Sequence, residues 1–103
     1  MRNMLVVLAV MSSLGLSPGA YADSHEDAYV AVERGDFTKA VRFWKKLADR
    51  GDSNAQFNLG TMYDTGRGVP QDYQEAARLF RLSAEQGHAL ARFNLGTMYT
   101  TGQ

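Results

Sequence analysis

Apolar side chains recur along the chain at intervals of three and four positions, which is the spacing of amphipathic helices. The clearest stripe consists of Phe37, Ala40, Val41, Trp44, Leu47 and Ala48. Further stripes follow it, separated by short polar or glycine-containing stretches. The pattern predicts an all-α protein with about five helices, near residues 25–34, 37–50, 54–64, 73–86 and 89–99.

Residues that begin and end helices stand at the predicted boundaries. Asp36 and Asp72 each precede a helix, where a carboxylate accepts hydrogen bonds from free backbone amides. Ser53 and Gln56 form a capping-box pattern, and Ser24–Asp27 can cap the first helix. Glycines, which favour the left-handed backbone that ends a helix, follow the helices at Gly35, Gly51, Gly66, Gly87 and Gly102.

The tripeptide Arg-Gly-Asp occurs twice, at residues 34–36 and 50–52. One interpretation is a cell-adhesion motif. The other is a turn between helices, with a basic residue at the end of one helix, a glycine, and an aspartate that caps the next. Both copies stand where the pattern requires a turn, so we favour the turn.

One stretch of the chain is written twice. FNLGTMYDTG at residues 57–66 returns as FNLGTMYTTG at residues 93–102, with nine of ten letters identical after a shift of 36 positions. The same shift carries Asp36 to Asp72 and Trp44 to Phe80. A fixed period of this length, made of two helices, indicates an α-solenoid in which neighbouring units stack into one continuous core.

The repeated helix has two apolar sides. At 100° per residue, one side carries Ala55, Leu59, Met62 and Tyr63, whereas Phe57 and Gly60 point to roughly the opposite side. Two apolar faces suit a helix that is packed between its partner and the next unit. A glycine within a helix costs about 1 kcal/mol relative to alanine, so Gly60 indicates a neighbouring helix that crosses closely, and Gly96 repeats the arrangement.

The first 22 residues have the three parts of a secretory signal peptide. Arg2 supplies the positive charge, Met4–Met11 is apolar, and Ala20–Ala22 fits the small-x-small cleavage pattern. The apolar run is too short to cross a bilayer, which takes about 20 residues. We therefore expect cleavage after Ala22 and export to the periplasm or the medium, leaving Asp23–Gln103 as the mature domain without stable membrane insertion.

Composition excludes several classes of site. The 11 basic and 11 acidic residues balance, so nothing favours nucleic acid as a partner. No cysteine is present, which excludes disulfides, thiolate metal sites and a cysteine nucleophile. His25 and His88 lack a carboxylate-rich partner set at ligand spacing, so we expect no metal and no cofactor. No S-x-x-K, G-x-S-x-G or H-E-x-x-H motif occurs, so we expect no catalytic residues and no enzyme activity.

The pattern A-x-F-N-L-G-x-M-Y-x-x-G-x-G-V-x-x-D-x-x-x-A, at residues 55–76, resembles the Sel-1-like repeat, a relative of the tetratricopeptide repeat. The match continues through Phe80, Ala84 and Gly87 into the second copy. It divides the mature chain into a degenerate first unit at about 25–51, a full repeat at 52–87 and a partial repeat at 88–103.

The resemblance implies a right-handed α/α superhelix of antiparallel helix pairs that serves as a scaffold for another protein or peptide. Exported bacterial members of this family are similar to adaptors and regulators that act in envelope signalling or in host interaction. Some cysteine-rich relatives bind or hydrolyse β-lactams, which keeps a hydrolase as an alternative, although this chain lacks their cysteines.

In such a superhelix the first helix of each unit tends to line the concave surface. Asn58 and Asn94 belong to the family pattern, so they either hold neighbouring turns or contact a ligand. The candidate protein-binding surface is Gln56, Asn58, Thr61, Arg92, Asn94 and Thr97.

Two further surfaces leave alternatives open. Basic residues away from the apolar stripes form either a solvated outer face or a docking site for anionic envelope polymers; they are Lys39, Arg42, Lys45, Lys46, Arg50, Arg78 and Arg81. The last helix repeats Phe93 and Gly96 without a visible following unit. It is an imperfect cap, the edge of a longer array, or a site of self-association.

Overall fold

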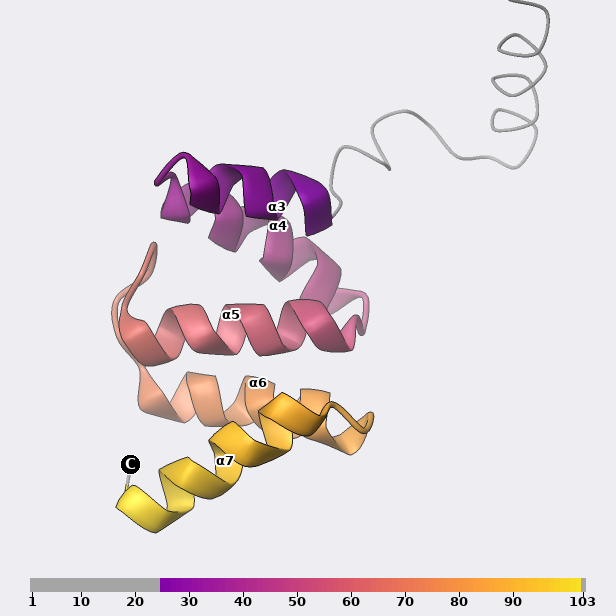
Figure 1. Ribbon diagram of the computed structural model, residues 1–103, viewed down its shortest axis with the longest axis vertical. Helices are drawn as coiled ribbons and strands as arrows, with labels where there is room; N and C mark the ends of the chain where they lie inside the picture. The colour runs from indigo at the N-terminus through magenta and orange to yellow at the C-terminus, as the bar shows by residue number, and fades with distance from the viewer. Residues whose placement is uncertain (1–24, 103) are drawn as a thin grey trace, which may run out of the picture.

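The structure, a computed structural model, describes residues 25–102 of the 103-residue chain. The predicted signal peptide and the predicted Ser24 cap lie outside the described residues. Within them the chain forms five helices and no strand, which confirms the all-α prediction. The helices are α3 (His25–Glu33), α4 (Phe37–Asp49), α5 (Ser53–Thr65), α6 (Tyr73–Glu85) and α7 (Ala89–Thr101) (Figure 1).

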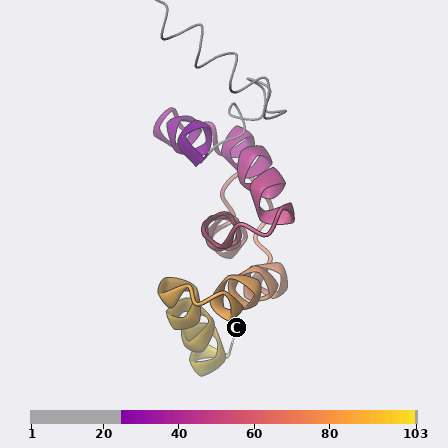
Figure 2. The ribbon, with the colours of Figure 1, turned by 90° about the vertical axis from the view of Figure 1, so that its right-hand side faces the viewer.

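The helices form two layers. Each helix packs on its neighbours in the chain, most extensively α5 on α6, so the helices succeed one another along the long axis of the molecule (Figure 1). Helices α3, α5 and α7 lie on one side, with α5 set back between the other two, and α4 and α6 lie on the other side (Figure 2). This arrangement is the predicted α/α superhelix, and we call the side of α3, α5 and α7 the inner face.

Aspartates begin three of the helices. The side chains of Asp36 and Asp72 accept hydrogen bonds from the backbone N–H groups of Lys39 and Glu75, each at 3.1 Å, which confirms the two predicted caps. The predicted Ser53 cap is wrong. Asp52 caps α5 instead, accepting from the backbone N–H of Ala55 at 2.9 Å.

Asp52 caps α5 in preference to Ser53 because its carboxylate has a second partner. The Nε2 atom of His25, at the start of α3, lies 2.9 Å from Asp52 Oδ1. The hydrogen bonds that an ionised carboxylate accepts are stronger than those that a neutral hydroxyl accepts, and here they come from both a backbone amide and a side chain of another helix. Helix α5 therefore begins at Ser53, one residue earlier than predicted. The Gln56 side chain bonds Gln86 of α6 and takes no part in the cap.

Both Arg-Gly-Asp tripeptides form turns. Gly35 and Gly51 have φ values of +75° and +90°, in the left-handed region. Asp36 and Asp52 then cap the helices that follow. The interpretation as helix-to-helix turns is therefore confirmed.

Helix α5 packs on both sides, as its two apolar faces predict. Ala55, Leu59 and Met62 belong to the buried cluster that joins α3 to α5, whereas Phe57 packs against the cluster of α6 and α7. On the α6 side, a Cβ atom added to Gly60 would lie 2.8 Å from Cε1 of Phe80. The glycine is therefore required by the close approach of α6, as predicted.

Candidate protein-binding surface

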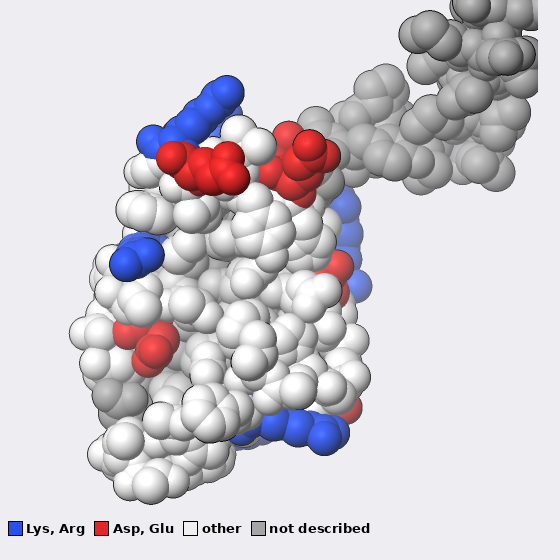
Figure 3. Space-filling view, in the orientation of Figure 1, with Lys and Arg blue, Asp and Glu red and all other residues white. Residues whose placement is uncertain are grey.

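The inner face carries few charged side chains. In Figure 3, which views this side, the surface over α5 and α7 is largely free of Lys, Arg, Asp and Glu, and acidic side chains gather over α3. A ligand on this face would therefore meet hydroxyl, amide and apolar groups before it meets a charge. The predicted surface residues divide into those that lie on this face and those that do not.

Asn58 of α5 links two helices of the inner face. Its Nδ2 donates a hydrogen bond to the hydroxyl of Tyr29, on α3, at 3.1 Å. The Tyr29 side chain is 50% exposed, and its ring meets the edge of Trp44 at a centroid distance of 5.5 Å. Trp44 itself is buried, as predicted for a core residue. Asn58 keeps one N–H donor and its carbonyl oxygen for other partners.

Asn94 holds the equivalent place on α7, one repeat later. It is half-buried, and its side chain makes no hydrogen bond to any residue in the range 25–102. Its amide therefore keeps both donors and its acceptor available. Asn58 therefore uses part of its amide to hold Tyr29, whereas Asn94 makes no such contact within the described residues, and a ligand contact of either asparagine stays a prediction.

Thr61 and Thr97 use their hydroxyl protons within their own helices. They donate to the carbonyl oxygens of Phe57 and Phe93, four residues earlier, at 3.1 and 3.0 Å. Each hydroxyl oxygen can still accept a hydrogen bond. These two threonines therefore offer acceptors to a ligand and no donors.

The prediction that Gln56 faces solvent is wrong. Gln56 is only 5% exposed, and its Oε1 accepts a hydrogen bond from Nε2 of Gln86, on α6, at 2.8 Å. It lies on the side of α5 that α6 covers. Arg92 holds the same register on α7 but is exposed, and its Nε donates to the carbonyl oxygen of Ala84 at 3.2 Å. Arg92 therefore belongs to a different side of α7 from Asn94.

The two histidines join helices together, a role that the sequence analysis did not assign. His88 caps α7: its Nδ1 accepts from the backbone N–H of Ala91 at 3.2 Å, and its Nε2 lies 3.1 Å from Oδ1 of Asn54. Its ring stacks on Phe57 at a centroid distance of 4.7 Å. The repeat register could have indicated that His88 is a helix cap, since a shift of 36 places His88 where Asp52 stands.

The His25–Asp52 pair lies at the matching place one unit earlier. Burial raises the pKa of the Asp52 carboxyl, but the hydrogen bonds from the Ala55 N–H and from His25 outweigh it and hold the pKa below its ordinary value. No set of three or more His, Cys, Asp or Glu side chains within residues 25–102 is placed to hold a metal ion. None of the five described helices combines the length and apolarity needed to cross a bilayer.

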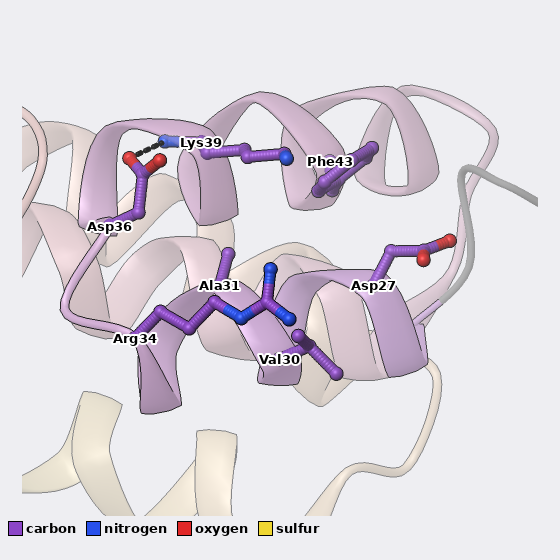
Figure 4. Close-up of a pocket in the computed structure, with 7 residues that line it drawn as sticks. All are labelled: Asp27, Val30, Ala31, Arg34, Asp36, Lys39 and Phe43. Atoms are coloured by element: carbon purple, nitrogen blue, oxygen red, sulfur yellow. Dashed lines mark hydrogen bonds between the residues drawn. The ribbon is translucent and has the colours of Figure 1, made fainter.

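A groove lies between α3 and α4. This groove has a volume of about 470 Å³, and Arg34 and Lys39 extend along its opposite walls (Figure 4). The Nζ atom of Lys39 lies 6.0 Å from the ring centroid of Phe43. A shift of 36 carries Phe43 to Leu79, which is buried in the core. The groove therefore lies at the N-terminal edge of the described helices and is separate from the asparagines of the inner face.

The basic residues of α4 and α6 are exposed, as predicted. Arg78 and Arg81 of α6 contact neighbouring side chains. Arg78 forms an ion pair with Glu75, and Nη2 of Arg81 donates to the Tyr99 hydroxyl at 2.8 Å. Binding of anionic polymers by this outer face stays a prediction.

A family model described as the Sel1 repeat matches three consecutive segments, at residues 20–52, 53–88 and 89–103. These segments cover most of the chain. The chain belongs to the Sel1 repeat family. Sel1 repeats generally mediate protein–protein interaction, and their helical scaffold is typically non-catalytic.

A solved Sel1 repeat protein from Oxalobacter formigenes has the same architecture. It is 29% identical to this chain with a TM-score of 0.67, and the match covers 89% of this chain and 40% of that protein. The DAP3-binding cell death enhancer 1 proteins of Rattus norvegicus and Mus musculus are each 46% identical over 41 residues. That match covers 40% of this chain and 8% of each relative, so these Sel1 repeats span a small part of the relatives' length.

Proposed function

We propose that this chain is an exported Sel1-repeat scaffold that binds another protein through an extended peptide segment on its inner face. The observation that carries the proposal is the scarcity of charged side chains over α5 and α7, with Asn58 and Asn94 placed one repeat apart. Its role would be that of an adaptor or regulator in the bacterial envelope.

The chemistry of the two asparagines favours a peptide backbone as the ligand. A primary amide can accept from a backbone N–H and donate to a backbone C=O at the same time. Asn94 has this capacity unused, and Asn58 retains part of it. Thr61 and Thr97 add acceptors beside them. Specificity would then come from ligand side chains that reach neighbouring groups such as Tyr29, which is half exposed.

A displayed library of extended peptides tests this surface. Selected peptides should bind Asn94→Ala about 5- to 10-fold more weakly than the wild type, since one or two hydrogen bonds of about 0.5–1.5 kcal/mol each are lost. Arg42→Ala, on the exposed outer face, is the matched control and should leave binding unchanged. Peptides that ignore Asn94→Ala but weaken with Arg42→Ala would place binding on the outer face and refute the proposal.

Export has its own test. When the full chain is expressed in a bacterium, the protein outside the cytoplasm should begin at Asp23, because Ala20–Ala22 fits the cleavage pattern. Sequencing of the N-terminus after cell fractionation makes the measurement. A chain that stays in the cytoplasm with residues 1–22 attached would contradict export, and this result would not bear on the proposed binding face.

A further inference from the structure

His88 fastens the start of α7 to α5 by three contacts. It stands in the turn between α6 and α7, and its Nδ1 accepts a hydrogen bond from the backbone N–H of Ala91, in the first turn of α7, at 3.2 Å. Its Nε2 lies 3.1 Å from Oδ1 of Asn54, on α5. Its ring is stacked on Phe57, also on α5, with an angle of 22° between the ring planes. The α6–α7 turn therefore lies beside the start of α5 (Figure 1).

These contacts require a neutral imidazole in one tautomer. A ring nitrogen that accepts a hydrogen bond carries no proton, so Nδ1 of His88 is unprotonated where it meets the Ala91 N–H. The proton of the neutral ring is then on Nε2, which donates to Oδ1 of Asn54. Both nitrogens of His88 are therefore satisfied only while the ring is uncharged.

Protonation of His88 would remove the cap of α7. Both ring nitrogens of an imidazolium carry protons, so Nδ1–H would face the N–H of Ala91 with no acceptor between them. The added positive charge would also stand at the positive end of the helix dipole. The Nε2–H bond to Asn54 persists, and the charged ring is attracted to the face of Phe57. The ring therefore stays with α5, and the first turn of α7 loses its hold.

Charged side chains of the neighbouring elements do not offset this effect. Asp52, ahead of α5, is bonded to His25, and Glu85 ends α6. No ion pair joins His88 to a carboxylate within residues 25–102. Arg92, one turn into α7, donates to a backbone carbonyl of α6 and adds a second positive charge near the imidazole. The surroundings of His88 therefore supply no partner for its charged form.

The joint one repeat earlier responds differently to acid. A shift of 36 places Asp52 at the position of His88. The Asp52 carboxylate accepts from the backbone N–H of Ala55 at 2.9 Å, and Nε2 of His25 lies 2.9 Å from the same oxygen. A protonated His25 still donates from Nε2 and is attracted to the carboxylate. The link between α3 and α5 therefore keeps both bonds when the histidines become charged.

We propose that His88 makes the joint between α5 and α7 sensitive to pH, whereas the joint at Asp52 stays closed. An ordinary imidazole changes its charge near about pH 6.5, so the α7 joint is closed at about pH 7.5 and loosened at about pH 5.5. Asn58 and Asn94 stand on the two helices that this joint connects. If the proposed peptide-binding face is correct, and this consequence rests on it, acid separates the two halves of that face.

Residue-resolved hydrogen exchange, measured by NMR on the full chain, tests the joint. Between about pH 7.5 and about pH 5.5, the opening constant of α7 should rise about 5- to 10-fold relative to that of α5, which is the size of a lost helix cap. His88→Asn supplies a cap that does not titrate, so this variant should lose the pH effect. His25→Asn removes the other imidazole and is the matched control, in which the effect should persist.

Three results would overturn the proposal. The first is an α7 that opens no more readily at the lower pH. The second is an equal rise in His88→Asn, which would place the titrating group elsewhere. The third is a loss of protection in α4 and α5 together with α7, which would mean that acid unfolds the whole stack.

Peptide binding gives a separate readout. Peptides selected on the inner face should bind the wild type more weakly at about pH 5.5, in proportion to the fraction of chains with the joint closed, and His88→Asn should bind them equally at both pH values. If no peptide binds at either pH, the proposed binding face fails, while the exchange measurement still decides whether His88 controls the joint.

Discussion

Gly60→Ala and Gly96→Ala form a matched pair, because the two glycines stand at the same position of consecutive repeats. Each substitution adds one methyl group to the middle of a helix whose surrounding sequence is FNLGTMY in both cases. At Gly60 the new Cβ would lie 2.8 Å from Cε1 and 2.9 Å from Cδ1 of Phe80. At Gly96 no described atom lies within 4 Å.

The magnitudes follow from two opposing effects. Replacing a helical glycine by alanine stabilises a helix by about 0.5–1 kcal/mol. At Gly60 the methyl group also overpacks a fully buried ring, which costs about 1–3 kcal/mol. Because the propensity gain is common to both variants, it cancels in the comparison. Gly60→Ala should therefore be less stable than Gly96→Ala by about 1–3 kcal/mol.

Urea unfolding followed by far-UV circular dichroism measures the difference between the variants. A smaller side chain at position 80 should relieve the clash, so Phe80→Leu is expected to cost less in the Gly60→Ala background than in the wild type. The same Phe80→Leu change should show no coupling to Gly96→Ala. Equal stability of the two glycine variants would refute the close approach of α6 to α5.

The other predictions concern the joints between helices. Asp52→Ala should lower the free energy of unfolding by about 1–2 kcal/mol, because α5 loses its cap and His25 loses its partner. The folded pKa of Asp52 is lowered, so its contribution is present above the ordinary carboxyl pKa and is lost as pH falls through the folded value; Asp52→Ala should flatten the acid limb of the stability-against-pH curve. Gln56→Ala should cost about 0.5–1.5 kcal/mol in urea unfolding, because it removes the hydrogen bond from Nε2 of Gln86, which keeps its bond to the carbonyl oxygen of Gly51. A nitrocefin assay on the purified chain should show no turnover, and turnover abolished by a single surface substitution would contradict a scaffold without catalysis.

Much of the fold could be predicted from sequence because its determinants are local. Asp36 and Asp72 cap helices whose first amides are three residues away, and a glycine follows each helix. The close approach at Gly60 could also be predicted, since a glycine in a helix needs a packing reason. The Sel1 register then places each helix relative to the next.

The α5 cap and Gln56 differ from the sequence prediction because their partners are distant in the sequence. Ser53 and Asp52 are both good helix caps by type, and His25, 27 residues earlier, supplies the contact that favours Asp52. Polarity alone predicts that Gln56 faces solvent. Its partner Gln86 lies 30 residues later, and the pair satisfies each other in the interface between α5 and α6. A hydrophobic pattern cannot distinguish such a residue from a surface one.

The repeat register itself shows where function can reside. Positions that keep their residue type across the shift of 36, such as Phe57 and Phe93, carry the stacking pattern of the repeat. Positions that change type carry the information that stacking does not need. The change from buried Gln56 to exposed Arg92 occurs on a face whose Phe and Gly are unchanged. Arg92 keeps a link to α6 through the carbonyl oxygen of Ala84 and retains further N–H donors that stacking does not use.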